Sequence, residues 1–112
     1  MNPITDDYMR EWLKKRKPYT IVILRNGPKA NEPNADKLIW EHGRRNFELR
    51  RDGVLCIVCM ITDESEVAGL CIFSTDLEET RRIMEEDVAV RARILTYEIH
   101  PAKGFPGDAL AR

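Results

Sequence analysis

The chain lacks any apolar run long enough to span a membrane, and it carries almost no net charge. Its 112 residues hold 18 Lys and Arg against 19 Asp and Glu, which gives a formal net charge of -1. A membrane-spanning helix needs about 20 predominantly apolar residues, so we expect no membrane partner. A balanced charge offers no electrostatic footprint for a polyanion, so we expect no nucleic-acid partner.

Cysteine is also scarce, with three residues in the chain. Three cysteines argue against a disulfide framework. Cys56 and Cys59 have the spacing of half a zinc site, but an offset of three on a strand places them on opposite faces. We therefore expect all three to be small core residues, with no bound metal and no cofactor. The polar, acidic start MNPITDDYMR is unlike a secretory signal, and we expect a cytoplasmic location.

The most informative stretch runs from Asn34 to Gly53, NADKLIWEHGRRNFELRRDG. Asn34 is a good N-cap and Gly53 suits a left-handed helix stop, so the stretch predicts a helix. At about 100° per residue, one face of this helix collects Ala35, Leu38, Ile39, His42, Asn46 and Leu49. A second stripe, which faces elsewhere and needs another cover, consists of Trp40, Gly43 and Phe47.

A shorter amphipathic helix is predicted at residues 4–17, with an apolar stripe of Ile4, Tyr8, Met9, Trp12 and Leu13. We predict that this stripe covers the Trp40–Phe47 stripe of the longer helix. The chain then divides into an N-terminal helix at residues 1–18, a folded domain at 19–101 and a C-terminal tail at 102–112. The Gly- and Pro-rich tail predicts no regular structure.

Within the domain, strands are predicted at residues 19–25, 54–61, 67–73 and 90–99, with a helix that follows Ser74-Thr75-Asp76. The order is β-α-β-β-α-β, which predicts an α+β, ferredoxin-like antiparallel sheet with both helices on one face. RNA-recognition domains share this order but stack bases on aromatic side chains of the central strands. The central strands VLCIVCMI and VAGLCIF offer only Phe73, so we expect no RNA.

The first three strands are apolar on both faces, whereas the two domain helices cover only one. In the first strand, Val22 and Leu24 face one side while Ile21 and Ile23 face the other. A single chain would leave the second face in water, and large exposed apolar patches usually mark an interface. We therefore predict a homodimer that packs sheet to sheet.

Three blocks of sequence, in this order and spacing, point to a known family. They are WEHGRRNFELRRDG at residues 40–53, STDLEETRRIMEEDVAV at 74–90 and ILTYEIHP at 94–101. Together with the hairpin strands, they make the chain resemble the YCII-related domain family. The resemblance implies a ferredoxin-like fold that dimerises into an α+β barrel. It also implies a pocket with a His and an Asp, which fall on His42 and Asp87, and some relatives look like lyases acting on chlorinated aromatics.

His42 and Asp87 also make chemical sense as a pair. In the predicted topology, the end of the second domain helix lies beside the start of the first. A carboxylate that holds one imidazole nitrogen fixes the tautomer and leaves the other nitrogen free for proton transfer. Such a pair suits an isomerase or lyase acting on a small cyclic or aromatic ligand. The alternatives are a structural pair between two helices, a non-catalytic small-molecule binding module, or an accessory dimerisation domain.

Asn46 and Arg45 are the candidate substrate-binding residues. Asn46 lies one turn from His42 on the same face, where its amide could orient a carbonyl or hydroxyl group; it could equally cap a loop. Arg45 lies at the edge of that face, where it could meet an anionic substrate. The competing and favoured interpretation of Arg45 is a solvated surface cation.

Overall fold

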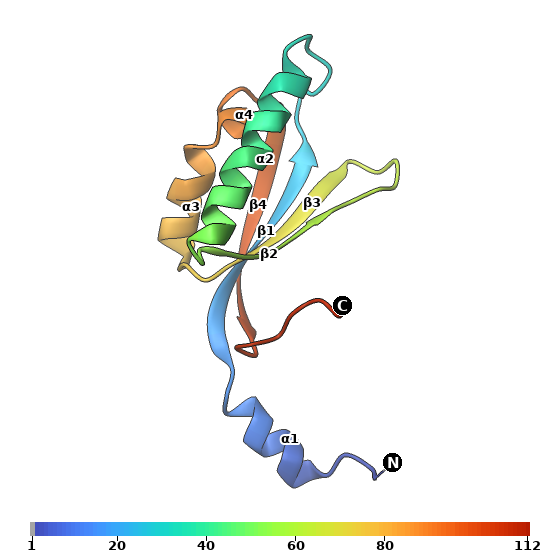
Figure 1. Ribbon diagram of the computed structural model, residues 1–112, viewed down its shortest axis with the longest axis vertical. Helices are drawn as coiled ribbons and strands as arrows, with labels where there is room; N and C mark the ends of the chain where they lie inside the picture. Colours follow the sequence, from blue (N-terminus) through green and yellow to red (C-terminus); the bar gives the residue numbers. More distant parts are fainter. Residues whose placement is uncertain (1) are drawn as a thin grey trace.

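The computed structural model describes residues 2–112 and has an α+β architecture. Its elements, in chain order, are α1 (Asp6–Leu13), β1 (Lys17–Asn26), α2 (Ala35–Arg51), β2 (Leu55–Met60), β3 (Val67–Phe73), α3 (Leu77–Glu85), α4 (Val88–Arg91) and β4 (Leu95–Gly104) (Figure 1). The four strands form one sheet in the order β2-β3-β1-β4, and every neighbouring pair is antiparallel. This arrangement is compatible with the predicted ferredoxin-like fold.

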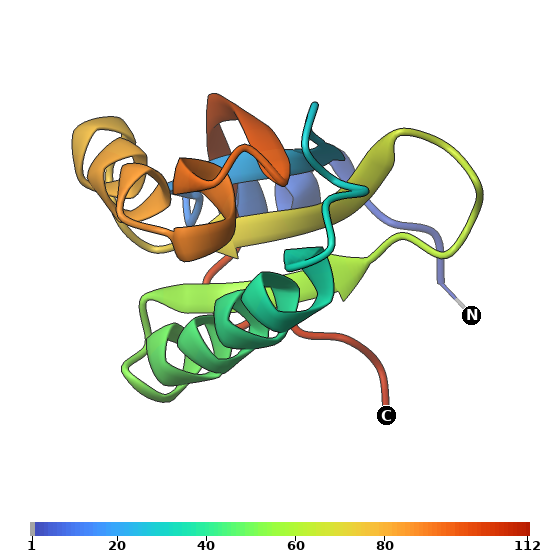
Figure 2. The same cartoon turned by 90° about the horizontal axis from the view of Figure 1, so that it is seen from above.

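The core lies between the sheet and three helices. Side chains alternate along β1, and Thr20, Val22 and Leu24 are the buried members. Val22 sits between Cys71 of β3 and Ile99 of β4 in the strand register. Figure 2 shows α2 alongside β2, whereas α3 and α4 lie beside β4. The burial of Val22 and Leu24 confirms the predicted inner face of the first strand.

No helix of the described residues 2–112 covers the opposite face of the sheet. Its apolar side chains are half-buried rather than buried, and they come from three adjacent strands: Ile21, Ile23, Ile57, Cys59, Leu70 and Ile72. On β4, the same face is polar, with Glu98 opposite Ile23 and His100 opposite Ile21. We call this surface the open sheet face.

Helix α2 forms where the sequence predicts it. Asn34 precedes it, although its side chain makes no capping hydrogen bond. Gly53 follows with φ of 76°, a left-handed conformation in which glycine is favoured because it has no Cβ. The helix therefore ends at the predicted residue.

The predicted contact between the N-terminal helix and the long helix is wrong within one chain. Helix α1 ends at Leu13 rather than at residue 17, because β1 already begins at Lys17. Strands β1 and β4 stay paired beyond the ends of β2 and β3, and α1 lies at the far end of this pair (Figure 1). There, Trp12 meets Phe105 edge-on, with ring centroids 6.1 Å apart. Trp40 and Phe47 stay uncovered, with exposed fractions of 70% and 68%.

The last strand also differs from its prediction. A strand was expected from Val90 to Ile99, but residues 88–91 form the short helix α4, and Arg93 then adopts φ of 62°. Strand β4 begins at Leu95 and continues to Gly104, opposite Lys17 of β1. Part of the predicted irregular tail is therefore strand. Pro101 is tolerated there because β4 is an edge strand.

Candidate functional site

His42 and Asp87 meet between two helices. His42 lies on the inner face of α2, and Asp87 is the N-cap of α4. The imidazole Nδ1 lies 2.7 Å from Asp87 Oδ2, and the two side chains are only 11% and 2% exposed. The predicted approach of these residues is therefore confirmed.

The second oxygen of Asp87 anchors the carboxylate to the backbone. Oδ1 accepts hydrogen bonds from the amides of Ala89, at 2.9 Å, and Val90, at 3.3 Å. Burial alone raises the pKa of Asp87, but the hydrogen bond and charge of His42, together with the two amides, outweigh it and hold the pKa below its usual value. Asp87 is therefore an ionised acceptor at neutral pH, and Nδ1 of His42 carries the hydrogen between them.

The other imidazole nitrogen is already engaged. With the hydrogen on Nδ1, Nε2 presents its lone pair and accepts from Asn46 Nδ2 at 3.2 Å. The prediction that this nitrogen is free is therefore wrong in this conformation. Asn46 lies one helical turn after His42, on the same face of α2, which explains the contact. For Nε2 to take a proton from a ligand, the Asn46 amide must turn away.

Arg45 is not the solvated cation that was favoured from the sequence. Its side chain is 25% exposed, and its Nη1 donates to the carbonyl of Ile83 at 2.7 Å. The same nitrogen lies 3.7 Å from Asp87 Oδ2, and Nη2 lies 3.8 Å from Glu86. A cation here favourably meets the carbonyl end of α3. Arg45 therefore joins α2 to the end of α3, a role that its position in the sequence did not reveal.

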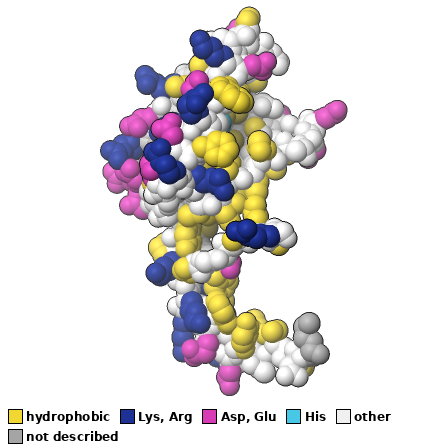
Figure 3. Space-filling view, in the orientation of Figure 1, with side chains coloured by type: hydrophobic (Ala, Val, Ile, Leu, Met, Phe, Trp, Pro, Cys, Tyr) yellow, Lys and Arg dark blue, Asp and Glu magenta, His cyan; other side chains and the backbone are white. Residues whose placement is uncertain are grey.

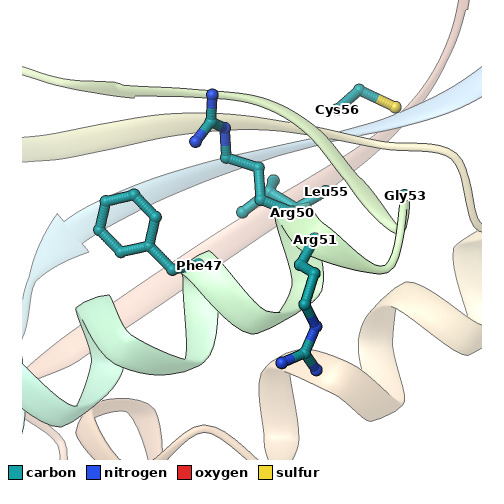
Figure 4. Close-up of a pocket in the computed structure, with 6 residues that line it drawn as sticks. All are labelled: Phe47, Arg50, Arg51, Gly53, Leu55 and Cys56. Atoms are coloured by element: carbon teal, nitrogen blue, oxygen red, sulfur yellow. The ribbon is translucent and has the colours of Figure 1, made fainter.

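Two hollows lie elsewhere on the surface. The larger one, about 600 Å³, lies where α2 ends and β2 begins, and it is lined by Phe47, Arg50, Arg51, Gly53, Leu55 and Cys56 (Figure 4). The smaller one, about 330 Å³, lies at the start of α3 and is lined by Asp76, Glu78, Glu79 and Arg82. Neither of these two hollows is lined by His42 or Asp87.

The cysteines occupy three different environments. Cys71 is buried, and burial is the main reason that its pKa is raised to about 12. Cys59 is half-buried on the open sheet face, whereas Cys56 is exposed, so the prediction of three core cysteines is wrong for Cys56. Within residues 2–112, no group of three or more His, Cys, Asp or Glu side chains could hold a metal ion.

Comparison with known proteins identifies no family for this chain. No protein-family model and no curated protein matches the chain. Among solved structures, it is similar to a de novo designed protein named Ferredog-Diesel, with 19% sequence identity over 75% of this chain and 84% of that one and a TM-score of 0.46. In the part of the chain that the structure describes, no helix combines the length and the apolar character that crossing a membrane requires. The YCII resemblance and the roles of His42, Asp87, Asn46 and Arg45 stay predictions.

Proposed function

We propose that two copies of this chain pack their open sheet faces together to form a dimeric α+β barrel, as in the YCII-related family that the sequence resembles. The support is the sheet itself. The open sheet face carries six apolar side chains on the adjacent strands β2, β3 and β1. No helix within residues 2–112 covers them. An aligned pair of sheets buries such faces with a spacing of about 10 Å.

Within this dimer, we propose that the chain is a cytoplasmic small-molecule isomerase or lyase that uses His42 as its general base. The observation that carries the proposal is the 2.7 Å contact between His42 Nδ1 and a nearly buried Asp87. This contact fixes the tautomer, so that Nε2 is the basic nitrogen. Asp87 serves as a positioning residue that stabilises the imidazolium once a proton is taken.

The step that this geometry suits is proton abstraction from a carbon acid. The C–H bond next to a carbonyl or on an activated ring breaks, the proton goes to His42 Nε2, and the electron pair enters the adjacent π system. The imidazolium then returns the proton to another carbon, which completes an isomerisation. In an elimination, the electron pair instead expels a leaving group from the neighbouring carbon. Asn46, released from Nε2, would be placed to donate to the ligand's oxygen.

Hydrogen exchange tests this step without knowledge of the full reaction. A panel of small cyclic acids, phenols and ketones is incubated with the protein in D₂O, and deuterium incorporation at carbon is read by NMR. We expect at least one compound to exchange faster with the wild type, and His42→Gln to abolish the gain. The Gln variant keeps a polar side chain toward Asp87, and circular dichroism checks that it folds. Equal exchange with both proteins would contradict the proposal.

The contact of Asn46 with Nε2 favours a second candidate, a non-catalytic module that binds a small molecule or only supports dimerisation. In that case, the row Asn46, His42 and Asp87 is a satisfied polar network that joins α2 to α4. Ligand-induced thermal shifts that survive in His42→Gln, with no exchange for any compound, would favour this candidate over the enzyme.

A further inference from the structure

The outer face of α2 carries two aromatic rings with a gap between them. Trp40 and Phe47 project from this face and are mostly exposed. Gly43 lies between them along the helix, and a Cβ built there would meet nothing within 4 Å. The three residues therefore form an open notch whose walls are aromatic, a shape that can accept a large side chain from another helix.

Helix α1 is an amphipathic helix whose apolar side chains stay largely exposed, although Trp12 meets Phe105 of the same chain edge-on. None of its residues is buried. Its exposed apolar stripe consists of Tyr8, Met9, Trp12 and Leu13, and the exposed Ile4 lies just before the helix. Helix α1 lies beyond the end of the paired strands β1 and β4, away from α2 (Figure 1). Figure 3 shows hydrophobic surface both over α2 and along the projecting part of the chain. An apolar stripe of this kind usually marks an interaction surface.

We propose that α1 of one chain docks antiparallel on the outer face of α2 in a second copy, with Trp12 in the notch at Gly43. The lengths agree. Trp40 and Phe47 are seven positions apart, about 10 Å along a helix, and the eight residues of α1 span about 12 Å. The inference rests on the homodimer proposed above. It adds that the two chains exchange their N-terminal arms, the segments that carry α1.

Charge complementarity between α1 and α2 selects the direction of docking. Helix α1 begins with Asp6 and Asp7, and the basic residues 14–17 follow its end. Helix α2 has the same polarity: Asp36 lies in its first turn and Arg50 and Arg51 lie in its last. An antiparallel arrangement places the acidic start of α1 beside the basic end of α2. It also places the basic residues after α1 beside Asp36 at the start of α2. A parallel arrangement would bring like charges together.

The larger hollow lies at the end of α2 that the segment before α1 would reach in antiparallel docking. It adjoins Phe47 at the basic end of α2, and its walls include Arg50 and Arg51. Arg50 lies over the Phe47 ring, with its guanidinium carbon 5.9 Å from the centroid (Figure 4). Antiparallel docking brings the segment before α1, with the exposed Ile4, to this hollow. Ile4 then lies near the Phe47 ring, and the carboxylates of Asp6 and Asp7 lie near the guanidinium groups of Arg50 and Arg51.

Tryptophan fluorescence tests the docking in trans, because the chain has only two tryptophans. The reporter is the full chain with Tyr8→Ala, Met9→Ala and Trp12→Ala, which keeps Trp40 as its sole tryptophan and cannot cover it with its own arm. The silent partner carries Trp12→Phe and Trp40→Phe and keeps an apolar α1. The matched control partner carries Trp40→Phe together with the three alanine changes of the reporter. Acrylamide quenching of Trp40 and light scattering are followed as each partner is added in excess.

We expect the silent partner to shift Trp40 emission to shorter wavelength and to reduce its quenching constant to below half, whereas the control partner changes neither. The reporter and each partner are unfolded and refolded together, so that the excess partner pairs with the reporter. If light scattering then gives the mass of a dimer but Trp40 stays equally quenched with both partners, the docking of α1 is wrong and the sheet-to-sheet dimer stands. If the mixtures keep the mass of a single chain, the proposed homodimer fails and the exchanged arm fails with it.

Discussion

Asp87→Asn is expected to destabilise the protein in a way that isolates the charge of this buried side chain. Asparagine keeps the shape of the residue and remains a good N-cap for the amides of Ala89 and Val90. It loses the negative charge that faces His42 Nδ1 and Arg45. The variant therefore removes one charge-assisted hydrogen bond while leaving the start of α4 intact.

The expected loss is about 2 kcal/mol of unfolding free energy at neutral pH, because a hydrogen bond to a charged group contributes about 1.5–3 kcal/mol. Asp87→Ala also removes the N-cap, which adds about 1 kcal/mol, so its loss is about 3 kcal/mol. Against a total stability of about 5–15 kcal/mol, both losses are readily measured by urea unfolding followed by circular dichroism.

The pH dependence gives an independent check. The pKa of Asp87 in the folded protein lies below the ordinary value of an aspartate side chain, so the unfolded chain binds the proton more readily. The stability that Asp87 contributes is then complete above the pKa of the unfolded chain and is lost as the pH falls through the lower pKa of the folded protein. The gap between the wild type and Asp87→Asn should therefore narrow toward acid. A gap under about 0.5 kcal/mol at pH 7, the size of an ordinary surface change, or one that widens toward acid, would refute the assignment.

Two further predictions concern the cysteines and glycines. Cys56 is exposed, whereas the pKa of the Cys71 thiol is raised to about 12; iodoacetamide at pH 8 should therefore label Cys56 first, and mass spectrometry that finds Cys71 labelled as fast would contradict the buried site. A Cβ at Gly27 would collide with the carbonyl oxygen of Arg93, so Gly27→Ala should lower the midpoint of urea unfolding. The matched Gly43→Ala is made in the chain that also carries Tyr8→Ala, Met9→Ala and Trp12→Ala, so that no α1 stripe covers this position. There it adds a Cβ in open space on a helix and should raise the free energy of unfolding by up to about 1 kcal/mol; the reverse ranking would contradict the packing.

The elements predicted best from the sequence are those with their own start and stop signals. Helix α2 lies between Asn34 and Gly53, and its inner face could be read from the 3.6-residue period. The apolar alternation of β1 and the run at residues 67–73 likewise marked their strands. The approach of His42 to Asp87 then follows from the order of the elements, because antiparallel helices on one sheet face bring these positions together.

The errors come from interactions over long distances in the sequence. Residues 88–91 resemble the start of a strand, but Asp87 caps a helical turn there because its carboxylate is held by His42. Residues 102–104 look irregular on their own and become strand only because β1 pairs with them. The contact of Arg45 with the carbonyl of Ile83 joins residues 38 positions apart, and no local pattern encodes it. The contact of Asn46 with Nε2 is different, because the shared face of α2 and the spacing of one helical turn already favour it.

The mass of the protein in dilute solution tests the central claim that two sheets complete the fold. We expect sedimentation equilibrium to give twice the chain mass of 13.0 kDa. Leu70→Glu, on the open sheet face, should reduce it to the single-chain mass, whereas the matched Leu77→Glu, at the start of α3, should leave the dimer intact. A wild-type protein that stays at the single-chain mass and remains folded at micromolar concentration would contradict the account.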